Sequence, residues 1–171
     1  MSYQQDVIQS EEIEVQKLPT GLNVLTILSI IWTVLQFVGS VWGFISAKKN
    51  FDEKDKVLEQ LKSPDMPKFA KSMIGDPDQF INTVTKSYEN RIPILIVGLI
   101  AAALCFYGLL EMRKLRKQGF LLYTIGELLP FLSMAMFIGT YSISGIMAVL
   151  MMVIALVFIV LYASYRKKMV N

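Results

Sequence analysis

The chain has 171 residues, of which 54% are apolar and 18% are charged, and its formal net charge is +3. Soluble domains usually carry about 25% charged residues, so this composition argues against a soluble globular protein. With no histidine and one cysteine, the sequence excludes histidine-based catalysis, zinc sites and intrachain disulfides, and it has no Gly-rich nucleotide-binding loop. We therefore expect no cofactor, no metal ion and no enzymatic activity.

Residues 1–21 form an acidic segment with four acidic residues and one lysine. Its apolar residues follow no clear period, so we predict a mobile, solvated tail. The apolar run that follows, residues 22–47, is longer than the hydrophobic region of a signal peptide. We expect this run to remain in the mature protein as a membrane anchor.

Four apolar segments dominate the rest of the chain. They are residues 22–47, 92–110, 120–140 and 143–165, and they contain a single charged residue, Glu127. Each has close to the ~20 residues that cross a bilayer as a helix. The sequence therefore predicts an all-α fold, an integral membrane four-helix bundle in contact with the lipid bilayer. The intervening segments are a long loop, a basic loop and a basic tail, at residues 48–91, 111–119 and 166–171.

The first apolar segment carries small and weakly polar residues at alternating spacings of three and four. They are Thr26, Ser29, Thr33, Gln36, Ser40, Gly43 and Ala47. Such a stripe is typical of a face turned toward other helices, and Gly39 forms a GxxxG pair with Gly43. The second segment has a similar face, formed by Gly98, Ala101, Cys105 and Gly108. We interpret Cys105 as a small packing residue rather than a redox thiol.

The loop of residues 48–91 has the signals of a small amphipathic helical domain. Ser63 with Pro64, and Asp76 with Pro77, are both typical of a helix N-cap followed by proline at the first helical position. An apolar stripe follows each cap, and the first span is predicted to continue outward as an amphipathic helix. We expect these apolar faces to pack on one another or to lie on lipid head groups. A ligand or partner surface is the alternative.

Two clusters of basic residues flank the apolar segments. They are Arg113, Lys114, Arg116 and Lys117, and then Arg166, Lys167 and Lys168. We interpret them as cytoplasmic membrane anchors and expect no nucleic-acid binding. The loop of residues 48–91 has nine basic residues of its own, diluted by eight acidic ones, so the positive-inside rule gives nearly equal tallies for the two orientations. Because the dense clusters lie beside short connections, we predict that both termini are cytoplasmic.

Glu127 lies about seven residues into the third segment, roughly 10 Å from that end of a helix. A carboxylate at that depth costs about 2.5 kcal/mol or more, so we expect Glu127 to face the bundle and to be protonated or hydrogen-bonded. Depth along the helices makes Ser29 its expected direct partner. Gln36 is about 10 Å further along and would need helix tilt or water to reach it.

Pro130 follows three residues later and lacks a backbone N–H, so we expect a kink that frees the carbonyl of Gly126. Gly126, Glu127 and Pro130 therefore form one predicted local defect in the third helix. A defect of this kind is typical of a proton or ion site in transporters. The alternative is a neutral glutamic acid with a purely structural role, hydrogen-bonded between helices.

Three runs of the sequence are similar to a known group of proteins. They are Leu-Pro-Thr-Gly-Leu-Asn-Val-Leu-Thr-Ile-Leu at 18–28, Arg-Lys-Leu-Arg-Lys-Gln-Gly-Phe at 113–120 and Tyr-Thr-Ile-Gly-Glu-Leu-Leu-Pro at 123–130. In these runs the chain resembles an uncharacterised family of small four-span inner-membrane proteins of bacteria. The resemblance implies a bacterial cytoplasmic membrane location and carries no activity or site residues. Claudins and tetraspanins share the four-span outline, but their large loops hold cysteine pairs that this loop lacks.

Three classes of function remain open. We expect a non-catalytic membrane protein, either an accessory or scaffold subunit or a self-associating bundle, whose partners are other membrane-protein subunits or copies of itself. The alternative is a small transporter or channel subunit that uses Glu127 at a proline-kinked helix. A membrane enzyme would need convergent polar groups, which only Tyr107, Tyr123, Glu127 and the basic loop approach.

Overall fold

The structure is a computed structural model that describes residues 18–63, residue 67 and residues 76–169. Every element of regular structure in this part of the chain is a helix. The elements are α1 (Thr20–Asp52), α2 (Lys54–Lys62), α4 (Pro77–Glu89), α5 (Arg91–Arg113), α6 (Lys117–Phe137), α7 (Tyr141–Ser144), α8 (Ile146–Tyr165) and the 3-10 helix η1 (Arg166–Lys168). The tail predicted at the N-terminus and the helix predicted after Ser63 lie outside the described residues.

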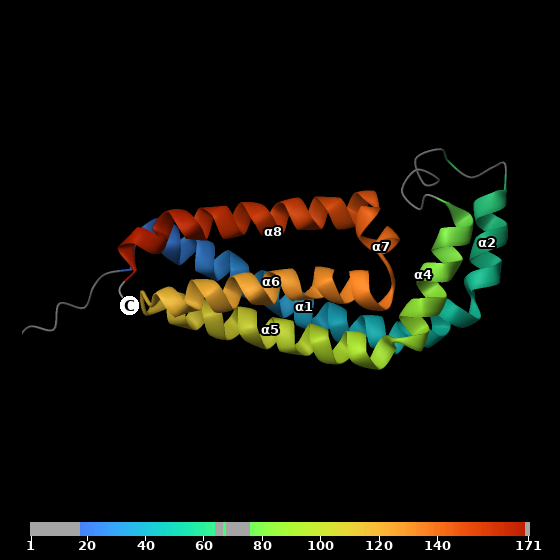
Figure 1. Ribbon diagram of the computed structural model, residues 1–171, viewed down its shortest axis with the longest axis horizontal. Coiled ribbons are helices and arrows are strands. Elements are labelled where there is room, and N and C mark those ends of the chain that lie inside the picture. The colour runs from blue at the N-terminus through green and yellow to red at the C-terminus, as the bar shows by residue number, and fades with distance from the viewer. Residues whose placement is uncertain (1–17, 64–66, 68–75, 170–171) are drawn as a thin grey trace, which may run out of the picture.

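Four helices of the described chain, α1, α5, α6 and α8, are long and apolar enough to cross a membrane. They lie side by side as a bundle (Figure 1). α1 has 33 residues and is roughly 50 Å long, so it continues well beyond the predicted segment. α6 ends at Phe137, before the predicted residue 140. Gly139 has a φ of 117°, and this left-handed conformation, which glycine tolerates best, ends the helix.

α5 and α6 form an antiparallel pair whose backbones approach closely at glycines (Figure 1). A Cβ on Gly126 would lie 2.6 Å from the Sγ of Cys105 and 2.8 Å from the carbonyl oxygen of Ala101. A Cβ on Gly108 would lie 2.6 Å from the backbone nitrogen of Tyr123. These distances exclude any side chain at the two glycines unless the backbones move apart. We call this contact the α5/α6 seam.

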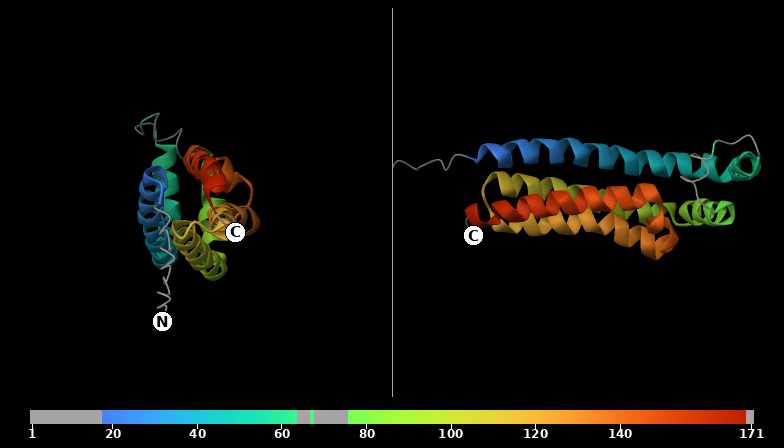
Figure 2. Two further views of the ribbon diagram at one scale, coloured as in Figure 1. Left: turned by 90° about the vertical axis from the view of Figure 1, so that its left-hand side faces the viewer. Right: turned by 90° about the horizontal axis from the view of Figure 1, so that it is seen from above.

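α1 packs along α5, and α8 lies over α6 (Figures 1 and 2). A Cβ on Gly98 would lie 2.6 Å from the Oγ of Ser40, so this glycine serves the contact of α5 with α1. The buried residues of α8 are Ala155 and Tyr162. Most of the other large side chains of α8 are exposed, while Phe158, Ile159 and Tyr165 are partly buried against the core.

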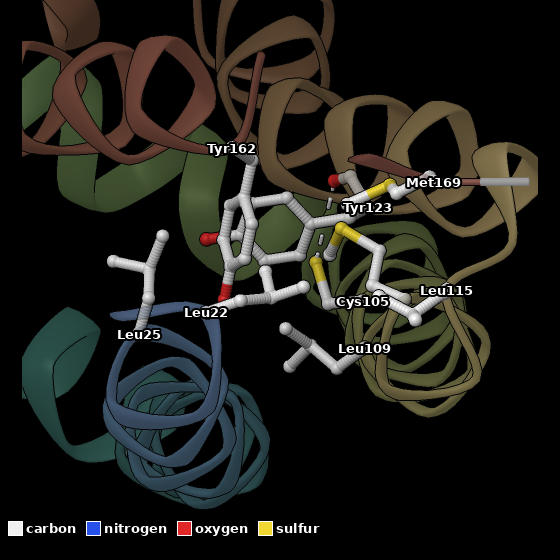
Figure 3. Close-up of a cluster of buried hydrophobic side chains, with 9 residues drawn as sticks. Leu22, Leu25, Cys105, Leu109, Leu115, Tyr123, Tyr162 and Met169 are labelled. Carbon is white, nitrogen blue, oxygen red and sulfur yellow. Dashed lines mark hydrogen bonds between the residues drawn. The ribbon is translucent and has the colours of Figure 1, made fainter. Parts of the chain in front are cut away.

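The buried core lies at the end of the bundle that holds the α5–α6 connection and the C-terminus (Figure 3). Its members are Leu22, Leu25, Cys105, Leu109, Met112, Leu115, Tyr123, Tyr162 and Met169. Outside this core many large apolar side chains are exposed, such as Trp42 at 69% and Val160 at 67%. An apolar surface of this extent is typical of a protein that contacts a membrane or other proteins.

α2 and α4 lie across the other end of the bundle and form a cap (Figure 1). The predicted N-cap of α4 is confirmed, because the Asp76 carboxylate accepts a 2.9 Å hydrogen bond from a backbone N–H in the first turn. The rings of Phe51 and Tyr88 stack with centroids 4.5 Å apart. Lys54 lies over Phe51 at 3.7 Å, and Arg91 lies over Tyr88 at 4.3 Å. This stack of two rings between two cations attaches α4 to the end of α1.

Candidate functional site

A group of buried polar side chains joins α1, α6 and α8. The hydroxyl of Tyr162 donates a 2.9 Å hydrogen bond to the Oγ of Ser29. The ring of Tyr162 meets that of Tyr123 edge to face, with centroids 4.9 Å apart (Figure 3). Tyr123 also interacts with Ser29 and Glu127. None of these four side chains is more than 4% exposed, and we call them the polar cluster.

Glu127 has one carboxyl oxygen without a partner. Its Oε1 is buried and has no hydrogen bond within the described part of the chain, and the same holds for the Oε1 of Gln36. Both residues line one cavity of about 180 Å³, together with Trp32 and Pro130. A second cavity, of about 190 Å³, reaches Glu127 and Tyr123 from between α1 and α8. Two unpaired acceptors beside small cavities are the distinctive chemistry of this site.

The two α1 residues predicted near Glu127 take different positions. Ser29 accepts a hydrogen bond from Tyr162, and Tyr123 interacts with both Ser29 and Glu127. Gln36 lines the same cavity as Glu127. α1 runs obliquely to α6 (Figure 1). Gln36 and Glu127 are therefore closer than counting residues from the helix ends predicts.

α6 continues through Pro130 as one helix. Pro130 lines the cavity at Glu127 and also a larger cavity, of about 380 Å³, beside the cap. Gly126, the third member of the predicted defect, is buried in the α5/α6 seam. This packing role of Gly126 is not predicted by the sequence.

The polar stripe of α1 lies on its inner side. Thr26, Ser29 and Thr33 are buried, while Gln36 and Ser40 are half-buried. The hydroxyl of Thr33 donates to the carbonyl of Ser29 at 2.8 Å, and that of Ser40 donates to the carbonyl of Gln36 at 2.9 Å. These hydroxyls are therefore satisfied within α1 itself, so they give little energy to helix association.

Gly39 and Gly43 of α1 differ from the closely packed glycines of α5 and α6. A Cβ on Gly39 or Gly43 would have no atom within 4 Å. Both glycines line the 380 Å³ cavity. The predicted GxxxG face therefore makes no close helix contact within the described chain.

The basic clusters lie at the end of the bundle where the described chain begins and ends. Glu111 is buried there and forms ion pairs with Lys114 at 3.1 Å and Arg116 at 2.9 Å. Arg113 donates to the Oγ1 of Thr26 at 3.5 Å. The basic side chains described in the two clusters are exposed, namely Arg113, Lys114, Arg116, Lys117, Arg166 and Lys167, and Lys168 lies in η1. Glu111 is not among the residues predicted from the sequence, although its spacing of three from Lys114 is typical of a helical ion pair.

Comparison of the chain with protein-family models, with curated proteins and with solved structures gives no match. The resemblance to small four-span bacterial inner-membrane proteins stays a prediction from the sequence. Within the described residues, no group of three or more cysteine or acidic side chains is placed to hold a metal ion. The buried oxygens of Glu127 and Gln36 that lack partners can accept hydrogen bonds.

Proposed function

We propose that this chain is a non-catalytic integral membrane protein, either an accessory or scaffold subunit of a membrane assembly or a bundle that associates with itself. The observation that carries the proposal is the pair of buried, unpartnered acceptors on Glu127 and Gln36. Hydrocarbon offers no water to satisfy such groups. A hydrogen-bond donor on a neighbouring transmembrane helix would pair with them, and interhelical hydrogen bonds of this kind favour association.

The outer helices support the same proposal. The cavities at Glu127 are lined by α1, α6 and α8, and α8 buries only Ala155 and Tyr162.

In this proposal the four long helices cross a bacterial cytoplasmic membrane, and both termini are cytoplasmic. The basic clusters at one end of the bundle support this orientation through the positive-inside rule. Cysteines introduced at Lys117 and Glu59, in a Cys105→Ala background, test it with an impermeant maleimide on intact cells. We expect labelling at Glu59→Cys alone, with Lys117→Cys reacting only after lysis; the reverse pattern would overturn the orientation.

A second candidate function is a small transporter or channel subunit. The specific observation that favours it concerns α6. Glu127 and Pro130 lie in this one helix, and Glu127 borders two cavities. In that case Glu127→Gln abolishes flux in proteoliposomes and leaves folding intact. Flux that is absent from the parent protein, or unchanged by the substitution, would exclude this alternative.

The first test of the subunit proposal is the mass and composition of the tagged full-length protein, extracted from its native membrane in mild detergent. We expect a stoichiometric hetero-complex or a homo-oligomer that is lost in Glu127→Ala. Glu59→Ala is the matched control, since Glu59 is exposed on α2. A monomer in the parent, or a complex that survives Glu127→Ala with the variant folded, would contradict the proposal.

A further inference from the structure

The cavity of about 380 Å³ beside the cap lies between α1, α4, α5 and α6. Its volume falls in the range of small-molecule sites, about 300–1,000 Å³. On α1 it extends from Gly39 to Asn50, which corresponds to about 16 Å at the helical rise. A largely apolar space of this length suits an extended hydrocarbon chain.

The two ends of this cavity differ in polarity. Near the cap its walls include the polar side chains of Asn50, Thr83, Ser87 and Arg91. Farther into the bundle the walls are apolar or small, with Gly43 and Leu95 among them. None of the described residues that line the cavity is acidic. The cavity is therefore amphipathic, with a cation at its polar end.

Arg91 is held in place at that polar end. Its guanidinium stacks on Tyr88 at 4.3 Å and donates through Nη1 to the carbonyl of Tyr88 at 3.1 Å. Among the described residues the ion pairs are those of Glu111, so Arg91 has no acidic partner there. A fixed guanidinium with unused N–H groups is a good phosphate ligand.

Ser133 gives an independent sign of a ligand. It lines the cavity, is only 5% exposed, and its Oγ has no hydrogen-bond partner within the described chain. It lies four residues before the end of α6, about 6 Å below that end by the helical rise. A buried hydroxyl at this depth is placed to donate to an ester carbonyl just below a charged head group.

We propose that this cavity binds one acyl chain of an anionic phospholipid. Arg91 pairs with the phosphate, Ser133 donates to an ester carbonyl, and the hydrocarbon chain lies along Gly39, Gly43 and Gly98. The open space at Gly39 and Gly43 is then filled by lipid, and this site does not depend on the assembly role of Glu127.

The test is a native mass spectrometry titration of the purified full-length protein with dioleoyl phosphatidylglycerol and dioleoyl phosphatidylcholine. We expect one tightly held phosphatidylglycerol per chain, bound at least about ten-fold more tightly than phosphatidylcholine, because charge-assisted hydrogen bonds contribute a factor of that order. Arg91→Gln removes the preference between the two lipids. Ser133→Ala weakens the binding of both lipids by a similar factor.

A cavity-filling variant separates this site from ordinary annular lipid. Gly43→Leu places a side chain in the open space and should reduce phosphatidylglycerol binding about ten-fold or more. Ala103→Leu is the control, since Ala103 is exposed on α5 and does not line the cavity. Thermal unfolding of each variant establishes that it is folded. Equal binding of the two lipids, equal effects of the two leucine variants, or displacement of the phospholipid by equimolar oleate would overturn the proposal.

Discussion

The hydroxyl of Tyr162 donates a 2.9 Å hydrogen bond to the Oγ of Ser29, 133 positions away in the sequence. The bond joins the last long helix to the first, at a place where α8 buries few other residues. The edge-to-face contact of Tyr162 with Tyr123 brings α6 into the same arrangement. The polar cluster therefore links three helices and holds Glu127 beside its cavities.

Tyr162→Phe removes this hydroxyl and keeps the ring. We expect the free energy of unfolding to fall by about 1 kcal/mol, the usual net value of one buried or interhelical hydrogen bond. Denaturant titration in mixed micelles measures the change. Tyr107→Phe is the matched control, because Tyr107 is 55% exposed on α5. If the free energy of unfolding falls equally in both variants, the hydrogen bond from Tyr162 to Ser29 does not stabilise the fold.

Gly126→Ala and Gly39→Ala should change stability in different directions. At Gly126 a methyl group meets Cys105 and Ala101 below 3 Å, so we expect a loss of about 1–3 kcal/mol from overpacking the α5/α6 seam. At Gly39 the methyl group has open space, and the higher helix propensity of alanine should stabilise the protein by up to about 1 kcal/mol. Thermal unfolding of the two purified variants is the measurement. A Gly126→Ala protein as stable as the parent would show that the seam is not closely packed.

Glu111→Gln should weaken the connection between α5 and α6. The substitution removes the ion pairs with Lys114 and Arg116, both of which are largely exposed. We expect a lower unfolding midpoint at low salt and a smaller decrease of that midpoint as salt is added, because salt screens exposed charges. Glu59→Gln, on the exposed side of α2, should leave both quantities unchanged. An unchanged salt dependence in Glu111→Gln would mean that the ion pairs do not stabilise the connection.

Cys105 should be chemically inert in the folded protein. Its side chain is fully buried in the core, with Sγ 3.8 Å from the carbonyl oxygen of Tyr123. We expect no maleimide adduct by intact mass in mild detergent, and one adduct per chain after denaturation. Glu59→Cys, on the exposed side of α2, provides the fast-reacting reference thiol. Labelling of Cys105 at the rate of that reference would contradict its buried position.

The four apolar helices were predictable from the sequence, because a run of about 20 apolar residues is a local property that does not depend on neighbouring helices. The N-cap at Asp76 was predictable for the same reason, since proline at the next position and the cap side chain act within one turn. Helix bounds were less predictable. The end of α6 is set by the backbone conformation of Gly139, which an apolar pattern does not reveal.

Which helix faces meet is visible only in the folded protein. Gly39, Gly43 and Gly126 look alike in the sequence, yet Gly126 is packed in the α5/α6 seam and the other two border a cavity. The approach of Gln36 to Glu127 and the bond from Tyr162 to Ser29 likewise depend on how the helices are inclined. The physical reason is that lipid and a helix interface are similarly apolar, so hydrophobicity does not mark the buried face of a membrane helix. Close backbone approach and a few long-range hydrogen bonds make that choice, and both exist only once the helices are assembled.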